Sequence, residues 1–182
     1  MKNILIIIIL SIFFFNNISA NERVIDSLKN EGKLIFIRHA HAPGGGDPNN
    51  FNIRDCKTQR NLDLEGIIQA KKIGNFFKDN NIPIDQVLSS EWCRCKDTAI
   101  NAFGNYKIFN ALNSFFSLKF AKNKDKQIRD LKFFVKKWDS KKNIVFITHY
   151  VVISEVLNES VNSGTIIVTD KNFKVIGTIK TN

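Results

Sequence analysis

The chain has 182 residues, with 27 Lys and Arg against 17 Asp and Glu and a formal net charge of +10. This length fits a single domain with its own core, and the positive charge favours anionic partners such as phosphorylated small molecules. Because the excess is spread over helices and loops and forms no basic stripe interleaved with aromatic residues, we expect no nucleic-acid-binding role.

The amino-terminal segment has the pattern of a secretory signal. Lys2 precedes an apolar run at 4–15 that is interrupted by Ser11, and a polar stretch with small residues then ends in Ala20. The run is shorter than the roughly 20 apolar residues that span a bilayer, so we expect cleavage after Ala20 and no stable membrane insertion. The chain then divides into a signal peptide at 1–20 and one periplasmic or secreted domain at 21–182.

The first predicted strand ends in two polar side chains. A short helix is expected at 21–31, and the apolar run at 33–38 predicts a buried strand that ends in Arg38 and is followed by His39. Open α/β sheets bind ligands beyond the carboxyl ends of their strands, so this exit is a candidate site. The next segment, 41–48, has two prolines and three consecutive glycines and is expected to be an irregular loop.

Helices and strands alternate through the rest of the chain. Asp63 is expected to be the N-cap or a first-turn acid of a helix that runs to about Lys78. Further helices are expected at 92–103, 126–138 and 151–157, and further strands at 86–89, 106–109, 143–148, 165–169 and 173–179. This order predicts an α/β fold, a three-layer α/β/α sandwich whose mostly parallel central sheet has an antiparallel carboxyl-terminal edge.

Two later strands also lead to polar side chains. The strand at 143–148 is followed by His149, and the strand at 86–89 leads into a helix with Arg94 in its first turns. Three strand exits thus bring two histidines and two arginines to one edge of the sheet. Between them, the connector at 110–125 lacks clear periodicity, and we expect its phenylalanines to pack at the edge of the site. These are Phe115, Phe116 and Phe120.

Three motifs carry a resemblance to a known family. They are Ile37-Arg38-His39, the stretch Ser90 to Ala99 with Arg94 and Thr98-Ala99 at fixed spacing, and Ile147-Thr148-His149. In this order they resemble the histidine phosphatase superfamily, the phosphoglycerate mutase-like proteins, over nearly the whole chain after residue 20. The resemblance implies that His39 is a nucleophile that takes a phosphoryl group. It implies that Arg38, Arg94 and His149 bind the phosphoryl oxygens, with no metal or other cofactor.

Phosphoryl-transfer chemistry supports these roles independently. Charge on the oxygens of a transferring phosphoryl group is stabilised by guanidinium groups and a second imidazole. Transfer to histidine divides one difficult hydrolysis into two easier steps. Arg60, just before the helix that follows Asp63, resembles the segment that borders the pocket in this family; contact with substrate and a surface ion pair both remain open for it.

The chain departs from the family pattern at two points. Ala40 stands where the family usually has glycine after the nucleophile. A glutamate that protonates the leaving oxygen in many members has no counterpart, since 106–124 contains no carboxylate. Asp47, on the glycine-rich loop, is our favoured general acid, although an aspartate before Pro48 also commonly forms a turn. The other candidates are Asp55, Glu91 and Glu155.

Cysteine and histidine usage leaves two further questions. We expect one disulfide, between Cys56 and either Cys93 or Cys95, as suits an exported protein; three unpaired buried thiols are the alternative. The histidines could instead hold zinc or copper, although a metal would leave the two arginines unexplained. The ligands of such a site would be His39, His41 and His149 with Asp55 or a cysteine.

These observations predict an exported phosphomonoester phosphatase that acts on a small phosphorylated substrate through phosphohistidine at His39. Mutase activity is disfavoured because the chain is too short for a large lid, and export disfavours a phosphohistidine protein phosphatase. The alternative from another class is a degenerate family member that binds phosphorylated envelope ligands without hydrolysis. The missing glutamate favours that alternative, whereas the presence of His39 favours catalysis. The oligomeric state stays open.

Overall fold

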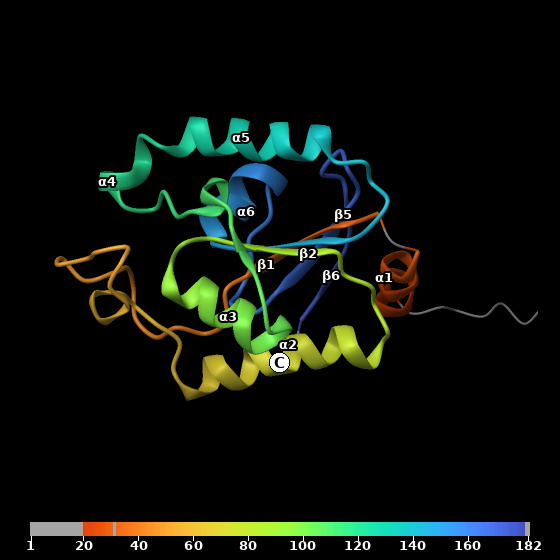
Figure 1. Cartoon of the computed structure of the whole chain (residues 1–182), viewed down its shortest axis with the longest axis horizontal. Helices are drawn as coiled ribbons and strands as arrows, with labels where there is room; N and C mark the ends of the chain where they lie inside the picture. Colours follow the sequence, from red (N-terminus) through yellow and green to blue (C-terminus); the bar gives the residue numbers. More distant parts are fainter. Residues whose placement is uncertain (1–19, 31, 181–182) are drawn as a thin grey trace, which may run out of the picture.

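A computed structural model describes residues 20–30 and 32–180 of the chain (Figure 1). Most of the predicted signal peptide, residues 1–19, lies outside the described residues. The first helix, α1, is Ala20–Lys29, so the predicted cleavage point falls at its first residue. Within the described ranges, no helix is long and apolar enough to cross a membrane.

The described residues form a six-stranded sheet in the order β3-β2-β4-β1-β5-β6. Its strands are β1 Leu34–Arg38, β2 Gln86–Ser89, β3 Lys107–Ile108, β4 Ile144–Thr148, β5 Ile166–Thr169 and β6 Val175–Ile179. The first four pair in parallel, whereas β5 pairs antiparallel with both β1 and β6. The mostly parallel sheet with an antiparallel carboxyl-terminal edge is therefore confirmed.

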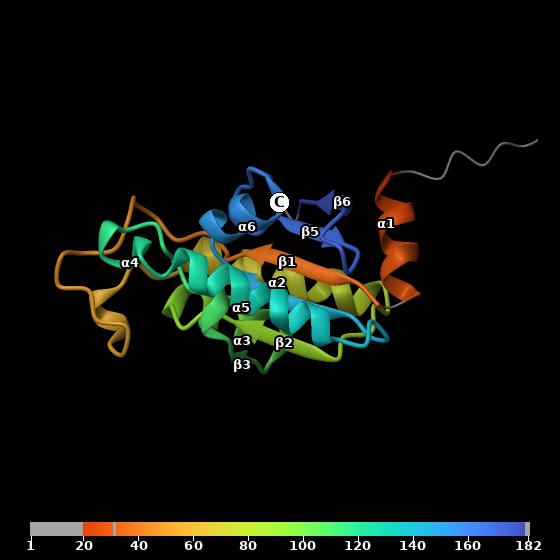
Figure 2. The same cartoon turned by 90° about the horizontal axis from the view of Figure 1, so that it is seen from above.

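Helices cover both faces of this sheet, which confirms the three layers (Figures 1 and 2). One face carries α2 and α3, the other carries α5 and α6, and α1 packs beside β6. The bounds are α2 Leu64–Asp79, α3 Cys93–Phe103, α4 Leu118–Ala121, α5 Lys124–Lys137 and α6 Tyr150–Leu157. Short 3-10 turns at Cys56–Thr58 (η1) and Asn110–Leu112 (η2) complete the order. Thus η2 and α4 interrupt the connector that was expected to be irregular.

Alternation along β1 explains the two cores. Ile35 and Ile37 point into the core beneath α2 and α3, whereas Leu34 and Phe36 point into the core beneath α5 and α6. All four side chains are fully buried. A strand buried on both faces reads as a continuous apolar run, and this is why β1 was recognisable from the sequence.

The α2–α3 layer depends on a cap and on a close approach. The Asp63 carboxylate accepts a hydrogen bond from the Gly66 backbone N–H at 2.8 Å, which confirms the predicted N-cap. A Cβ atom at Gly74 would lie 2.2 Å from the carbonyl oxygen of Ala102, so only glycine lets α2 approach α3 this closely. The close approach packs α2 against the carboxyl-terminal end of α3.

The strand exits that carry the motifs lie at one end of the molecule. The loop at 41–60 and α4 project from this end, at the left in Figures 1 and 2, whereas α1 lies at the opposite end. Backbone hydrogen bonds continue just past the strands, from His39 N to Thr148 O at 2.9 Å and from Ser90 N to Ile147 O at 3.0 Å. Hydrogen bonds between neighbouring strands therefore hold these exits in place.

Candidate active site

The side chains of the three motifs meet at a cleft of about 670 Å³. Arg94 Nε donates a hydrogen bond to His39 Nε2 at 3.2 Å, and the rings of His39 and His149 have centroids 5.5 Å apart. Arg38 and Arg60 also line the cleft. The structure thus brings together every residue of the predicted phosphoryl pocket, and Arg60 with them.

His39 presents a defined nitrogen to Arg94. Its Nδ1 lies 2.8 Å from the carbonyl oxygen of Ala40 and donates to it, so Nε2 carries the lone pair. The Ala40 N–H in turn donates to Thr98 Oγ1 at 2.9 Å, and Thr98 Oγ1 donates to the carbonyl oxygen of Arg94 at 2.7 Å. Thr98 therefore links the end of β1 to α3 through hydrogen bonds. Ala40, which stands where glycine was expected, is fully buried.

Both cleft histidines favour the neutral form. Burial, followed by the positive charge of Arg94, holds the pKa of His39 well below its ordinary value. Burial, Arg94 and then His39 hold the pKa of His149 well below its ordinary value in the same way. A neutral imidazole has a free lone pair, and hence His39 is poised as a nucleophile near neutral pH.

These two pKa values make stability depend on pH. An unfolded chain protonates both rings below about pH 6.5, but the folded chain does so only at lower pH. We therefore expect the free energy of unfolding to fall as pH drops below about 6.5, by about 1.4 kcal/mol per pH unit for each ring. Urea unfolding across this range measures the slope. His39→Asn should remove the part of the slope that this ring contributes. A flat wild-type profile would contradict the assignment.

A hydrogen-bond network fixes the tautomer of His149. Asn113 Oδ1 accepts from the Glu91 backbone N–H at 2.8 Å and from Ser90 Oγ at 3.1 Å, and Asn113 Nδ2 donates to Glu91 Oε2 at 2.6 Å. Since the single hydroxyl proton of Ser90 goes to Asn113, the 2.9 Å contact with His149 is a donation from His149 Nε2–H. Nδ1 is then the unprotonated nitrogen of the neutral ring.

Loss of Ser90 Oγ should therefore impair catalysis through His149. In Ser90→Ala the buried Nε2–H loses its acceptor, and we expect kcat to fall about tenfold and the acid limb of the pH profile to shift. Phosphate release measured against pH tests this. Ser89→Ala is the matched control, because Ser89 is also fully buried but donates only to the Ser90 carbonyl oxygen. Equal losses in the two variants would assign Ser90 a purely structural role.

Asp47 lies in the cleft, but its contacts are those of an ion-pair partner. Its Oδ1 accepts from Arg94 Nη1 at 2.7 Å and from Arg60 N at 3.1 Å, and its Oδ2 accepts from Trp92 Nε1 at 3.0 Å and from Arg94 Nη2 at 3.3 Å. Burial alone would raise the pKa of Asp47, but the hydrogen bonds and charge of Arg94 outweigh it and lower that pKa. Asp47 is thus held as a carboxylate, and its contacts do not support the expected role as general acid.

Glycines shape the loop that delivers Asp47. Gly44 and Gly46 have φ values of +90° and +84°, a region that glycine adopts without steric penalty.

The three other candidate acids lie elsewhere. Asp55 caps η1 by accepting from Lys57 N, Glu91 binds Asn113, and Glu155 pairs with Lys124 at 2.9 Å. None of these three lines the cleft.

Arg38 and Arg60 each use one guanidinium nitrogen for a backbone carbonyl oxygen. Arg38 Nη1 donates to the carbonyl oxygen of Val161 at 2.6 Å, and Arg60 Nη1 donates to the carbonyl oxygen of Ala42. The Nε atoms of both arginines are buried and have no hydrogen-bond partner among the described residues. A bound oxyanion is the kind of ligand that would satisfy such guanidinium groups.

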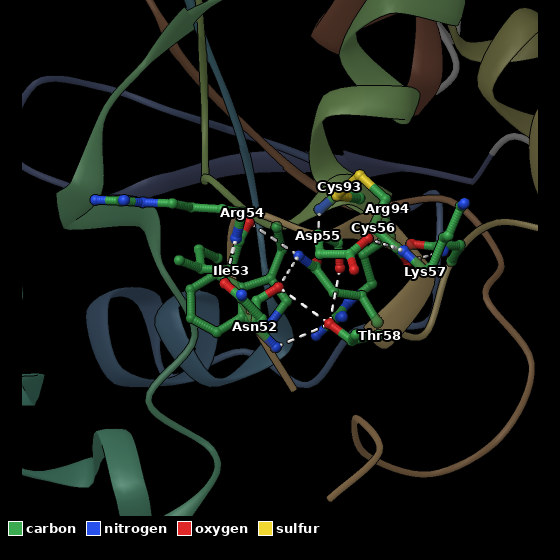
Figure 3. Close-up of a disulfide and its surroundings, with 12 residues drawn as sticks. Asn52, Ile53, Arg54, Asp55, Cys56, Lys57, Thr58, Cys93 and Arg94 are labelled. Atoms are coloured by element: carbon green, nitrogen blue, oxygen red, sulfur yellow. Dashed lines mark hydrogen bonds between the residues drawn. A yellow bond between two sulfur atoms is a disulfide. The ribbon is translucent and has the colours of Figure 1, made fainter. Parts of the chain in front are cut away.

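A disulfide joins the loop to the start of α3, beside Arg94 (Figure 3). It links Cys56 to Cys93, which settles the choice that the sequence left open. Cys95 is free and buried, and burial raises the pKa of its thiol to about 12, so it stays protonated. Its sulfur lies 3.5 Å from His149 Nε2. The free thiol therefore packs behind the site as a neutral group.

The histidines do not assemble the alternative metal site. Where the structure describes the chain, the group of histidine, cysteine and acidic side chains close enough to share an ion is His41, Asp63 and Glu65. His41 Nδ1 lies 3.2 Å from Asp63 Oδ1, and this contact holds the loop at the start of α2. His39 and His149 are not in that group.

Three contributors to the site escaped the sequence analysis. Asn113 has no signal in the sequence, because a lone asparagine in an irregular connector is unremarkable. Ser90 begins the second motif, and this position could have suggested a role beside the histidine. Trp92 was taken only as the start of a helix, yet it binds Asp47 and its ring lies 5.4 Å from that of His149.

The fold is shared with solved structures of phosphoglycerate mutase-like proteins. A mostly parallel α/β sheet with an antiparallel carboxyl-terminal edge is common to them and to this chain. The matching solved structures include phosphoglycerate mutase from Thermus thermophilus, with 15% identity, a TM-score of 0.59, and coverage of 81% of this chain and 98% of that chain. They also include the protein histidine phosphatase SixA complexed with tungstate, with 13% identity, a TM-score of 0.58, and coverage of 82% and 97%.

These similarities confirm the expected resemblance at the level of the fold. The solved structures belong to the histidine phosphatase superfamily and match over nearly their whole length. No protein-family model matches the sequence, and no curated protein matches it significantly.

Proposed function

We propose that this protein is an exported phosphomonoester phosphatase that acts through a phosphohistidine on His39, without a metal ion. The observation that carries the proposal is the contact between His39 Nε2 and Arg94 Nε at 3.2 Å, inside a cleft lined by His149, Arg38 and Arg60. A neutral nucleophile and three guanidinium groups meet at one point. This is the combination that phosphoryl transfer requires.

The reaction proceeds in two steps. His39 Nε2 attacks phosphorus, and the N–P bond forms as the P–O bond to the leaving group breaks. The charge on the phosphoryl oxygens is stabilised by Arg38 and Arg94, with His149 completing the pocket. Water then attacks the phosphohistidine, the P–N bond breaks with its electron pair returning to Nε2, and inorganic phosphate leaves.

A solved structure that shares the fold supports an oxyanion as the kind of ligand. SixA, which shares the fold, was solved with tungstate, an oxyanion like phosphate. The buried and unpartnered Nε atoms of Arg38 and Arg60 are consistent with an anionic ligand.

Export is supported by the covalent link beside the site. Disulfides persist in oxidising compartments and are rare in the cytosol, and Cys56–Cys93 joins the loop that carries Asp47 to α3. Fractionation of cells that make the full chain tests this part of the proposal. We expect a mature protein beginning at Asn21 in the periplasm or medium, whereas an uncleaved cytosolic protein would contradict export.

Phosphate release from a panel of phosphomonoesters, with and without a chelator such as EDTA, tests the activity. We expect release that continues in the chelator, because no step uses a metal. Loss of release in the chelator would overturn metal independence. No release from any ester, with tight phosphate or vanadate binding retained, would favour the alternative protein that binds phosphorylated ligands without hydrolysing them.

A second candidate, a phosphohistidine protein phosphatase, is favoured by one observation. Asp47, the carboxylate found among the described cleft residues, is committed to Arg94, and a phosphoramidate leaving group has different protonation needs from an alcohol. A phosphohistidine-containing peptide in the same panel distinguishes the two candidates, since only this second function predicts that the peptide is preferred over every ester.

A further inference from the structure

Aromatic rings line the part of the cleft that the phosphoryl pocket does not use. Phe51, Trp92 and Phe120 pack together, with ring centroids 5.3 Å apart for Phe51–Trp92 and 5.4 Å apart for Trp92–Phe120. Phe116 and Tyr150 form a second pair at 5.8 Å. Together these residues are the aromatic wall of the cleft.

The outer pair of the aromatic wall is open to solvent. Phe116 is 60% exposed and Tyr150 is 41% exposed, although both rings are large and apolar. Solvent-exposed aromatic rings beside a reacting centre provide a surface on which a flat, apolar ligand group stacks. The wall therefore favours an ester whose leaving group is itself a ring.

The same cleft lacks a free carboxylic acid among its described residues. Asp47 is its carboxylate, and four hydrogen bonds from Arg94, Arg60 and Trp92 occupy both oxygens. His41 also lines the cleft, but Asp63 and Glu65 at the start of α2 hold its Nδ1. The cationic groups around the cleft stabilise negative charge without giving up a proton readily.

A leaving group must then depart as an anion. An alkyl alkoxide is a poor leaving group because its conjugate acid is a far weaker acid than a phenol, whose pKa is about 10. Lys119, whose ammonium lies 5.6 Å from the centre of the Phe120 ring, adds a positive charge to the wall. A phenolate would therefore find both a ring surface and a cation in the cleft.

We propose that the substrates of this cleft are aryl phosphate monoesters, an inference that rests on the proposed phosphatase function. His39 Nε2 forms the bond to phosphorus as the bond from phosphorus to the aryl oxygen breaks. The electron pair of that bond leaves with the oxygen as a phenolate, which takes its proton from solvent after release. Water then releases inorganic phosphate from His39, as in the proposed function.

A series of substituted phenyl phosphates of graded leaving-group pKa tests this chemistry, alongside glycerol phosphate as the alkyl ester. The quantity to follow is kcat/KM, because it reports cleavage of the ester before the shared phosphohistidine step. We expect kcat/KM to fall about tenfold for each unit of leaving-group pKa, and to be at least about a thousandfold lower for glycerol phosphate. Phosphotyrosine is tested both as the free amino acid and within a short peptide. A higher kcat/KM for the free amino acid indicates a small aryl ester as substrate, and a higher kcat/KM for the peptide indicates a protein.

The possible outcomes separate the two proposals. A steep fall of kcat/KM with leaving-group pKa, together with a low kcat/KM for glycerol phosphate, supports aryl specificity. If kcat/KM does not change with leaving-group pKa and is similar for glycerol phosphate and the phenyl phosphates, aryl specificity is overturned. The cleft must then contain a general acid, but the phosphatase function stands. Failure to hydrolyse even the most activated phenyl phosphate overturns the phosphatase function itself.

The contribution of the wall is tested separately from leaving-group chemistry. In Phe116→Leu the apolar volume is largely kept but the ring is lost, and we expect KM for phenyl phosphates to rise about threefold to tenfold. Acetyl phosphate, which has a good leaving group but no ring, should be unaffected. Phe133→Leu is the matched control, since Phe133 is 58% exposed on α5 and does not line the cleft. Equal changes for both substrates in Phe116→Leu would contradict a ring-binding wall.

Discussion

His39→Ala is expected to lower kcat/KM for phosphoester hydrolysis by about 10⁴-fold or more, because the variant has no group to accept the phosphoryl moiety. The remaining pocket stays cationic, as Arg38, Arg60 and Arg94 are untouched, and we expect inorganic phosphate to bind within a few-fold of wild type. Initial rates with an activated phosphate ester and a separate binding titration measure the two quantities.

A nearby histidine supplies the control for this experiment. His41 lies two residues further on and pairs with Asp63, so His41→Gln should keep most of the activity. If His39→Ala retained more than about a tenth of the wild-type rate, the nucleophile would have to be another group. If the variant lost phosphate binding as well, the effect would be one of structure and would not identify a nucleophile.

Removal of the Cys56–Cys93 disulfide is expected to lower the free energy of unfolding by about 3–4 kcal/mol, since it frees a loop closed over a sequence separation of 37 residues. The double variant Cys56→Ala/Cys93→Ala should behave like the wild type after reduction. Denaturant unfolding with and without a thiol reductant measures both. A further effect on activity is expected, because the loop at 41–60 brings Asp47 and Arg60 to Arg94.

Two comparisons make this second prediction specific. Reductant should destabilise the wild type but leave the double variant unchanged. Cys95→Ala, which removes a buried thiol but no covalent link, should remain sensitive to reductant. A double variant as stable as the oxidised wild type would show that the link contributes nothing to the folded state.

The local parts of the site were predictable from the sequence. His39 and His149 each follow an apolar run long enough to be a buried strand, and Arg94 follows a third strand at the start of a helix. Parallel strands that neighbour one another necessarily bring their exits together. The fold and the residues of the phosphoryl pocket could therefore be predicted without knowing the conformation of the loops.

Contacts made by the loops were not predictable in the same way. Asp47 reaches Arg94 across 47 residues, and Asn113 reaches Ser90 across 23, so neither pair follows from local periodicity. The choice between Cys93 and Cys95 depends on the side of α3 that each presents. Residues two apart on a helix point in different directions, and here Cys93 meets the loop while Cys95 lies against His149.

The most direct test of the account is to trap the covalent intermediate. The purified protein is mixed with an activated phosphate ester, quenched at alkaline pH within the first turnovers, and analysed by peptide mass spectrometry. We predict one phosphoryl group on His39, labile to acid and absent from His41 and His149. Continuing turnover with no phosphoryl group on His39, or with one on another residue, would contradict the mechanism.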